Sequence, residues 1–175
     1  MIIAVHPSTD PTSSMLRSNG RVFRCCIGSG GVTTEKREGD RATPIGAWPL
    51  RRVFYRPDRT PAPDTGLTVV EITRDMGWSD DPRDTEYYNR LVTLPYPYSH
   101  EILWRTDGLY DLVLEVGYND HPPVPGLGSA IFLHVARPAY DSPTAGCIAL
   151  AINDLLEIVR DLGPGDMLHV APAMD

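Results

Sequence analysis

The apolar residues of this chain fall into short runs, which are separated by polar segments rich in proline and glycine. Many of these runs are dominated by β-branched and aromatic residues, which is typical of strands. They predict strands at residues 1–5, 20–28, 47–55, 67–73, 111–118, 129–136 and 167–170. The seventeen prolines and fifteen glycines supply the turns that short strands require.

One later segment has helical spacing instead. Its apolar residues follow the i, i+3, i+4, i+7 pattern of a single helix face, and they are Ile152, Leu155, Leu156, Val159 and Leu162. A Gly-Pro-Gly run at residues 163–165 ends this pattern. We therefore expect a mainly β fold with one clear C-terminal helix, and the length suits a single domain over residues 1–175.

The segments between the predicted strands are expected to be loops, namely residues 7–19, 28–40, 56–66, 74–90 and 95–100. Residues 101–104 fit either a short strand or a helical turn. The glycine run at residues 28–31 is not followed by the Gly-Lys-Ser/Thr of a phosphate-binding loop. The carboxylates at residues 80–84 lack the calcium-binding EF-hand pattern and indicate a solvated loop, although aromatic residues nearby could line a substrate groove.

The composition is that of an ordinary globular protein, with 42% hydrophobic and 22% charged residues. The net charge of −7 argues against a nucleic-acid partner, because such a partner requires a basic surface. No apolar run reaches 18 residues, so we expect no membrane-spanning segment. No signal peptide is visible, since the apolar residues 1–5 follow no basic segment and end at His6.

The chain contains three cysteines, which are Cys25, Cys26 and Cys147. They form neither a disulfide framework nor a Cys-x-x-Cys metal pair, and we expect no metal and no cofactor. Cys25 and Cys26 are adjacent, so in a strand their side chains point to opposite faces, where we expect them to pack as ordinary structural side chains. The alternative is a disulfide between these two neighbours, which needs unusual backbone geometry and would leave Cys147 as the lone unpaired thiol.

Cys147 is the candidate nucleophile, and His134 is the candidate base. A free thiol has a pKa of about 8.5, so a neighbouring imidazole that accepts its proton would lower this pKa and activate the sulfur. Gly146 allows a turn that can expose the thiol and aim backbone N–H groups at an oxyanion. His100 is the rival base, but no apolar frame fixes it. The alternative is a buried structural cysteine with a hydrogen-bonded structural histidine.

Two segments carry a family resemblance. Residues 144–150, Thr-Ala-Gly-Cys-Ile-Ala-Leu, preceded by His134, resemble the signature of the L,D-transpeptidase catalytic domain family, the YkuD-like fold. Residues 38–46, Glu-Gly-Asp-Arg-Ala-Thr-Pro-Ile-Gly, look like the Gly-Asp-x-x-Thr-Pro-x-Gly segment of the same family. With both in order, the likeness extends over residues 21–170. It implies a β sandwich or barrel and a cysteine-dependent acyl transfer on peptidoglycan stem peptides.

The signature departs from the family pattern at two positions. Its usual second histidine is Ala145 here, and the arginine that usually follows the cysteine is replaced by Ala149. The loop between His134 and Thr144 is also shorter than in most members. These changes leave two alternatives open beside the transpeptidase: a hydrolase such as an L,D-carboxypeptidase or amidase, and a non-catalytic module that binds the cell wall.

The resemblance also implies roles for residues around the pair. The backbone carbonyl of Val135 would orient the imidazole, and the hydroxyl of Thr144 belongs to the signature. Arg137 could bind a substrate carboxylate. We expect the predicted helix that follows Cys147 to lower the pKa of its thiol further. Because the family acts on the cell wall, a periplasmic or wall-associated location is implied, while the lack of a visible signal leaves a cytoplasmic one open.

Overall fold

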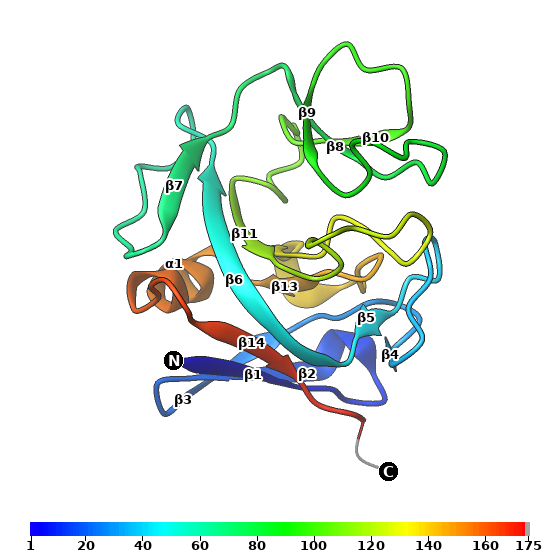
Figure 1. The fold of residues 1–175 in the computed structure, drawn as a ribbon. Coiled ribbons are helices and arrows are strands. Elements are labelled where there is room, and N and C mark those ends of the chain that lie inside the picture. Colours follow the sequence, from blue (N-terminus) through cyan, green and yellow to red (C-terminus); the bar gives the residue numbers. More distant parts are fainter. Residues whose placement is uncertain (174–175) are drawn as a thin grey trace.

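A computed structural model describes residues 1–173 and is mainly β (Figure 1). The strands are β1 (Ile2–His6), β2 (Ser14–Ser18), β3 (Arg21–Cys25), β4 (Val32–Thr33), β5 (Thr43–Pro44), β6 (Gly46–Tyr55), β7 (Thr68–Glu71), β8 (Met76–Ser79), β9 (Leu91–Thr93), β10 (His100–Ile102), β11 (Leu112–Val116), β12 (Phe132–Val135), β13 (Ile148–Leu150) and β14 (Met167–Val170). The α-helix is α1 (Ile152–Arg160), and short 3-10 turns cover Pro11–Ser13 and Pro138–Tyr140. No helix within residues 1–173 is long and apolar enough to cross a membrane.

Nine strands form the main sheet, in the order β13-β12-β11-β6-β14-β1-β2-β3, with β7 paired to β6. The two ends of this order meet, because Cys26, just after β3, pairs with Ala149 of β13. The Cys26 N–H donates to the Ala149 carbonyl at 2.8 Å, and the Ala149 N–H donates back at 2.9 Å. The sheet is therefore a nearly closed, barrel-like structure.

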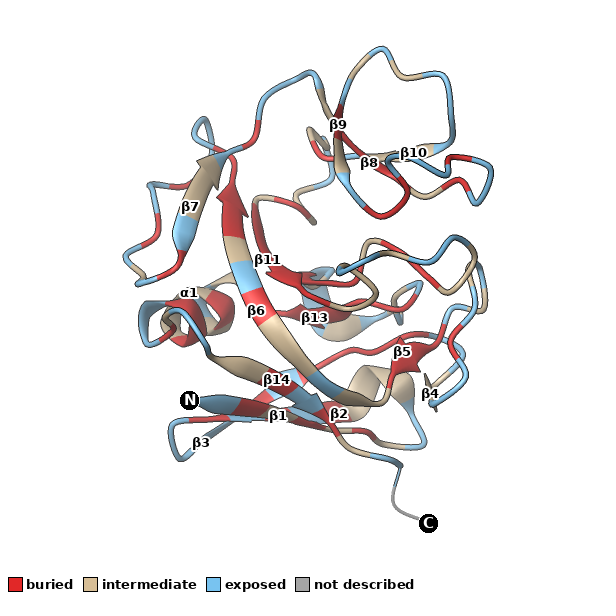
Figure 2. Ribbon diagram, viewed as in Figure 1, coloured by how far each residue is buried: buried red, intermediate tan, exposed pale blue. Residues whose placement is uncertain are grey.

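The barrel core explains why the strands were recognisable as apolar runs. In β11, Leu112, Leu114 and Val116 belong to the cluster inside the barrel, whereas Val113 belongs to a second cluster outside it. Alternate side chains of a strand point to opposite faces, so β11 is buried on both faces, as Figure 2 shows. Helix α1 adds a further layer, with Leu155 packed into the barrel core.

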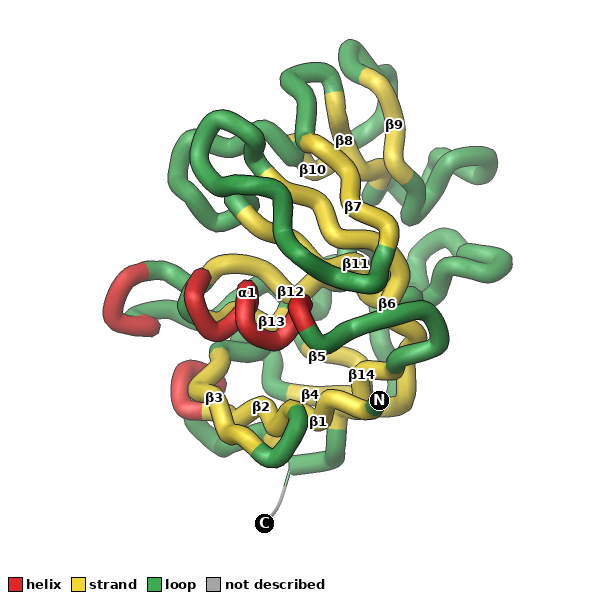
Figure 3. The backbone as a smooth tube through the Cα atoms, turned by 90° about the vertical axis from the view of Figure 1, so that its left-hand side faces the viewer, coloured by secondary structure: helices red, strands yellow, loops and turns green. Residues whose placement is uncertain are grey.

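The second cluster joins the outer face of the barrel to a three-stranded sheet of order β10-β8-β9. Trp78 of β8 packs edge-on against Phe132 of β12, with ring centroids 5.1 Å apart. Cys147 belongs to the same cluster. Figure 3 shows the small sheet on one side of the barrel strands, well separated from β1, β2 and β3. The thiol therefore lies at the junction of the two layers.

Several local predictions are confirmed and several are wrong. The strands around β1, β3, β6, β7, β11, β12 and β14 and the C-terminal helix are present as predicted, and residues 100–102 form a strand. The predicted loops at residues 7–19, 28–40 and 74–90 are interrupted by β2, β4 and β8, and β5 and β9 were not predicted. β13, which separates Cys147 from α1, was also missed. In β2 the inward positions 14 and 18 are serines, which hides its alternation.

A substitution at Gly28 tests the close packing where the barrel closes. A Cβ at this position would lie 2.2 Å from the carbonyl oxygen of Arg41 and 3.0 Å from the Cα of Gly146. Gly28→Ala should therefore lower the free energy of unfolding by about 1–3 kcal/mol or more. Gly163→Ala is the matched control, because a Cβ there meets nothing within 4 Å. Urea denaturation measures the free energy of unfolding of both variants, and equal midpoints would contradict the close packing at Gly28.

Candidate active site

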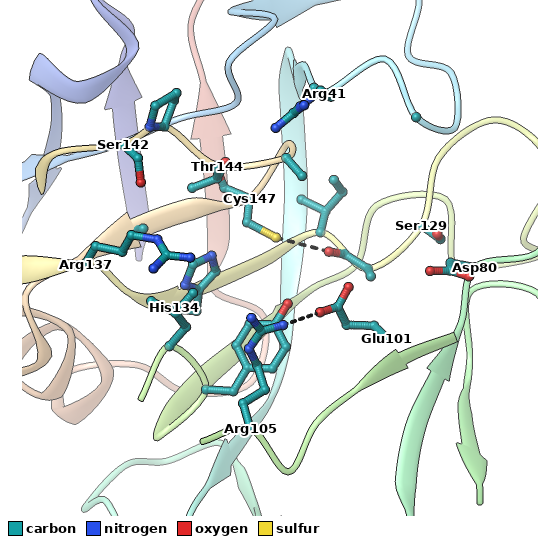
Figure 4. A pocket seen from close by; sticks show the side chains of 18 of the residues that line it. Arg41, Asp80, Glu101, Arg105, Ser129, His134, Arg137, Ser142, Thr144 and Cys147 are labelled. Carbon is teal, nitrogen blue, oxygen red and sulfur yellow. Dashed lines mark hydrogen bonds and ion pairs between the residues drawn. The ribbon is translucent and has the colours of Figure 1, made fainter. Parts of the chain in front are cut away.

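A cavity of about 340 Å³ opens between the barrel and the small sheet, and Cys147 and His134 both line it (Figure 4). The other lining residues are Glu38, Gly39, Arg41, Asp80, Glu101, Arg105, Leu109, Tyr110, Ser129, Ala130, Ile131, Arg137, Ser142, Pro143, Thr144, Ala145 and Ala149. They come from segments far apart in the sequence. The cavity is thus created by the tertiary fold.

The pairing of β12 with β13 brings Cys147 and His134 to the same cavity. The two strands are parallel, and His134 lies opposite Ala149. Cys147 is two residues before Ala149, so the two side chains lie on the same face. Residues 136–147 form the loop that connects the two strands, and Cys147 lies at the end of this loop. His100, the rival base, lies on β10 with its Nδ1 at 2.7 Å from the Tyr98 carbonyl, and it does not line the cavity.

The thiol of Cys147 is held by backbone groups of the segment that leads into β12. Its Sγ donates to the Ala130 carbonyl at 3.1 Å, and it accepts from the Phe132 N–H at 3.4 Å. Only 9% of the residue is exposed, and this burial raises the pKa of the thiol to about 12. The expected lowering of the pKa is therefore wrong. The helix cannot supply it, because β13 separates Cys147 from the start of α1.

His134 is held in one orientation and is neutral. Its Nδ1–H donates to the carbonyl of Val135 at 2.9 Å, which leaves Nε2 as the proton acceptor. The ring of Tyr110 packs edge-on against the imidazole, with centroids 5.4 Å apart. Burial lowers the pKa of His134 to about 4. The contact implied for the Val135 carbonyl is present, but Val135 packs against the barrel core and does not line the cavity as a substrate-binding residue would.

The turn before Cys147 is fixed by Thr144. The Thr144 hydroxyl donates to the Cys147 carbonyl at 2.6 Å and accepts from the Gly146 N–H at 3.1 Å. Gly146 has a φ of +134°, which disfavours other residues, and a Cβ there would lie 3.0 Å from the Ala42 carbonyl oxygen. The Gly146 N–H, which was expected to bind an oxyanion, is therefore already engaged within the turn. Thr144 lines the cavity, but its hydroxyl serves the same turn.

Charged residues of both signs line the cavity. Arg137, Glu101 and Asp80 all line it and are labelled in Figure 4. Glu101 forms an ion pair with Arg105 at 2.8 Å, and burial raises the pKa of this carboxyl. Arg137, which the sequence offered as a ligand for a substrate carboxylate, therefore lines the cavity.

Sequence reasoning missed Glu101, Arg105 and Tyr110 as cavity residues. Residues 101–104 were read only for secondary structure, and no local motif marks these side chains. The Arg105 guanidinium lies 5.0 Å from the centroid of the Tyr110 ring, which in turn packs against His134. These contacts depend on how the small sheet meets the barrel.

Comparison with known proteins identifies the family of this chain. The family model described as YkuD, L,D-transpeptidase catalytic domain, matches residues 2–170. The chain belongs to this family. No curated protein matches the chain in a sequence comparison. The mainly β fold with one helix and a barrel-like sheet is the fold expected from the resemblance.

Two solved structures are similar to the chain. One is the helical cell shape determining protein Pgp2 from Campylobacter jejuni, with 15% identity and a TM-score of 0.44, covering 99% of this chain and 48% of that one. The other is L,D-transpeptidase 1 from Mycobacterium tuberculosis, with 16% identity and a TM-score of 0.37, covering 97% of this chain and 62% of that one. This L,D-transpeptidase family chain therefore spans less than two thirds of the length of either protein.

The pKa of Cys147 predicts how its alkylation depends on pH. Iodoacetamide reacts with the thiolate, so the rate at Cys147 should rise throughout pH 7 to 10 without a plateau, because the pKa is about 12. N-acetylcysteine is the control, and its rate should level off above its pKa of about 8.5. The rate at Cys147 is measured by peptide mass spectrometry, which separates it from Cys25 and Cys26. A plateau at Cys147 below pH 9 would count against this assignment.

The pKa of His134 predicts a loss of stability in acid. The folded-state pKa is about 4 and the unfolded value about 6.5, so the unfolded chain binds more protons between these values and stability falls as pH falls through them. The loss is on the order of 3 kcal/mol. His134→Gln removes it, so the unfolding free energy of this variant should change less between pH 6.5 and 4.5. The same decrease in both proteins would show that His134 is not buried in its neutral form.

Proposed function

We propose that this chain is a cysteine-dependent L,D-transpeptidase that acts on peptidoglycan stem peptides. The observation that carries the proposal is the presence of a thiol and an oriented neutral imidazole in one cavity, Cys147 and His134. Membership of the L,D-transpeptidase family supports the reaction class. The cavity, lined by both cationic and anionic side chains, also suits a charged peptide.

The first step is attack on the carbonyl carbon of the L-centre that precedes the terminal D-residue. The thiol leaves the Ala130 carbonyl, its proton passes to Nε2 of His134, and the sulfur forms a bond to carbon. Because both groups are neutral at rest, proton transfer accompanies the attack and needs no preformed thiolate. The Phe132 N–H, which already donates to Sγ, stabilises negative charge on the sulfur during this transfer.

The second step is collapse of the tetrahedral intermediate to a thioester. The bond from carbon to the leaving nitrogen breaks, and the imidazolium of His134 gives its proton to this nitrogen, which departs as the amine of a D-amino acid. The Val135 carbonyl holds the imidazole in one tautomer through both transfers. Arg137, which lines the same cavity, would bind the carboxylate of the terminal D-residue.

The third step transfers the acyl group to an acceptor amine. The amine attacks the thioester carbon and gives a proton to His134, the carbon–sulfur bond breaks, and the sulfur takes that proton back. The product is an L,D cross-link, and the enzyme returns to its neutral pair. Such a reaction belongs to the cell wall, so we place the protein in the periplasm or at the wall.

An exchange assay tests this function. The protein is incubated with a stem tetrapeptide and a second D-amino acid, and the products are followed by mass spectrometry. We expect the exchanged tetrapeptide, no product with Cys147→Ala, and a loss of about 10²- to 10⁴-fold with His134→Gln. His100→Gln is the matched control, because His100 lies outside the cavity, and it should retain activity.

The other outcomes of the assay identify the alternatives. Tripeptide without exchanged product would indicate a hydrolase that uses water in place of the acceptor amine. No conversion of the peptide at all would indicate a module that binds the cell wall without catalysis. Activity that survives in Cys147→Ala would contradict a nucleophilic role for this thiol.

A further inference from the structure

Thr43 of β5 lies behind the turn that carries Cys147, although it is 103 positions from Gly146. Thr43 is fully buried. Its hydroxyl donates to the Gly146 carbonyl at 2.9 Å and accepts from the Gly28 N–H at 2.9 Å. The hydroxyl thus connects the end of the barrel strand β3, through Gly28, to the turn before the thiol.

The Gly146 carbonyl and the Cys147 N–H belong to the same peptide unit. A trans peptide is planar, and its C=O and N–H point in opposite directions. Because Thr43 holds the carbonyl toward the buried interior, the Cys147 N–H is directed to the other side of the turn. That side carries the cavity, since Cys147 lines it and neither Thr43 nor Gly146 does.

We propose that Thr43 is a positioning residue that fixes the Cys147 N–H as a donor to the oxyanion of the tetrahedral intermediate. This inference rests on the proposed function, since it assumes acylation of Cys147. The Gly146 N–H already donates to Thr144 at 3.1 Å, so the next amide along the turn is the one left to serve an oxyanion.

Loss of the hydroxyl should allow the peptide between Gly146 and Cys147 to rotate, because its carbonyl loses the donor that holds it. Removal of an oxyanion donor slows acyl transfer by about 10²- to 10³-fold, and misplacement of the donor should cost at least tenfold. Thr43→Val keeps the shape and removes the hydrogen bonds, whereas Thr43→Ser keeps the hydroxyl. The serine variant should therefore restore acylation.

The test compares two reactions of the same sulfur. Acylation of Cys147 by a carbapenem passes through an oxyanion, whereas alkylation by iodoacetamide attacks a saturated carbon and forms none. Rates of both are followed by protein mass. We expect Thr43→Val to slow acylation at least tenfold while its alkylation rate stays within about twofold of wild type, and Thr43→Ser to acylate at close to the wild-type rate.

Equal acylation by wild type and Thr43→Val would overturn the inference, as would a parallel fall in acylation and alkylation, which indicates a displaced thiol. Thr43→Ala, which removes the hydroxyl without adding volume, serves for the same comparison if the valine variant does not fold. A wild-type chain whose Cys147 forms no acyl adduct with either a carbapenem or a stem tetrapeptide would contradict the proposed function, and this inference with it.

Discussion

The candidate site depends on hydrogen bonding along both edges of β13. This strand has only 3 residues, and one edge pairs with β12 while Ala149 exchanges two hydrogen bonds with Cys26 on the other. The pairing with Cys26 closes the barrel, and the pairing with β12 sets the register that brings Cys147 and His134 to one cavity. Barrel closure and the geometry of the site therefore depend on the same strand, and a change in the register of β13 would alter both.

Burial of the candidate site also has an electrostatic consequence. Removal of Cys147 and His134 from water disfavours charge on both, so the pair is neutral at rest, and hydrogen bonds to backbone groups hold the sulfur and the imidazole in place. A neutral thiol is a weak nucleophile, so the thiol of Cys147 should react slowly with electrophiles in solution.

Much of the fold could be read from the sequence because β11 and β12 are buried on both faces and form nearly continuous apolar runs. β2 was hidden by inward serines, and β13 is too short to show a pattern. The site pair was recognisable from its signature, yet the direction of the thiol pKa shift was wrong because burial is a tertiary property. The contact between Thr43 and Gly146 joins the two recognised segments, but no local spacing reveals it.

A covalent adduct on Cys147 decides whether the buried sulfur acts as a nucleophile. The protein is mixed with a stem tetrapeptide, quenched in acid within a fraction of a turnover, and its mass is measured before and after peptide digestion. The expected species carries the acyl tripeptide, without the terminal D-residue, as a hydroxylamine-sensitive thioester on Cys147. Turnover of the peptide with no adduct on this residue, or with the adduct on Cys25 or Cys26, would contradict the mechanism.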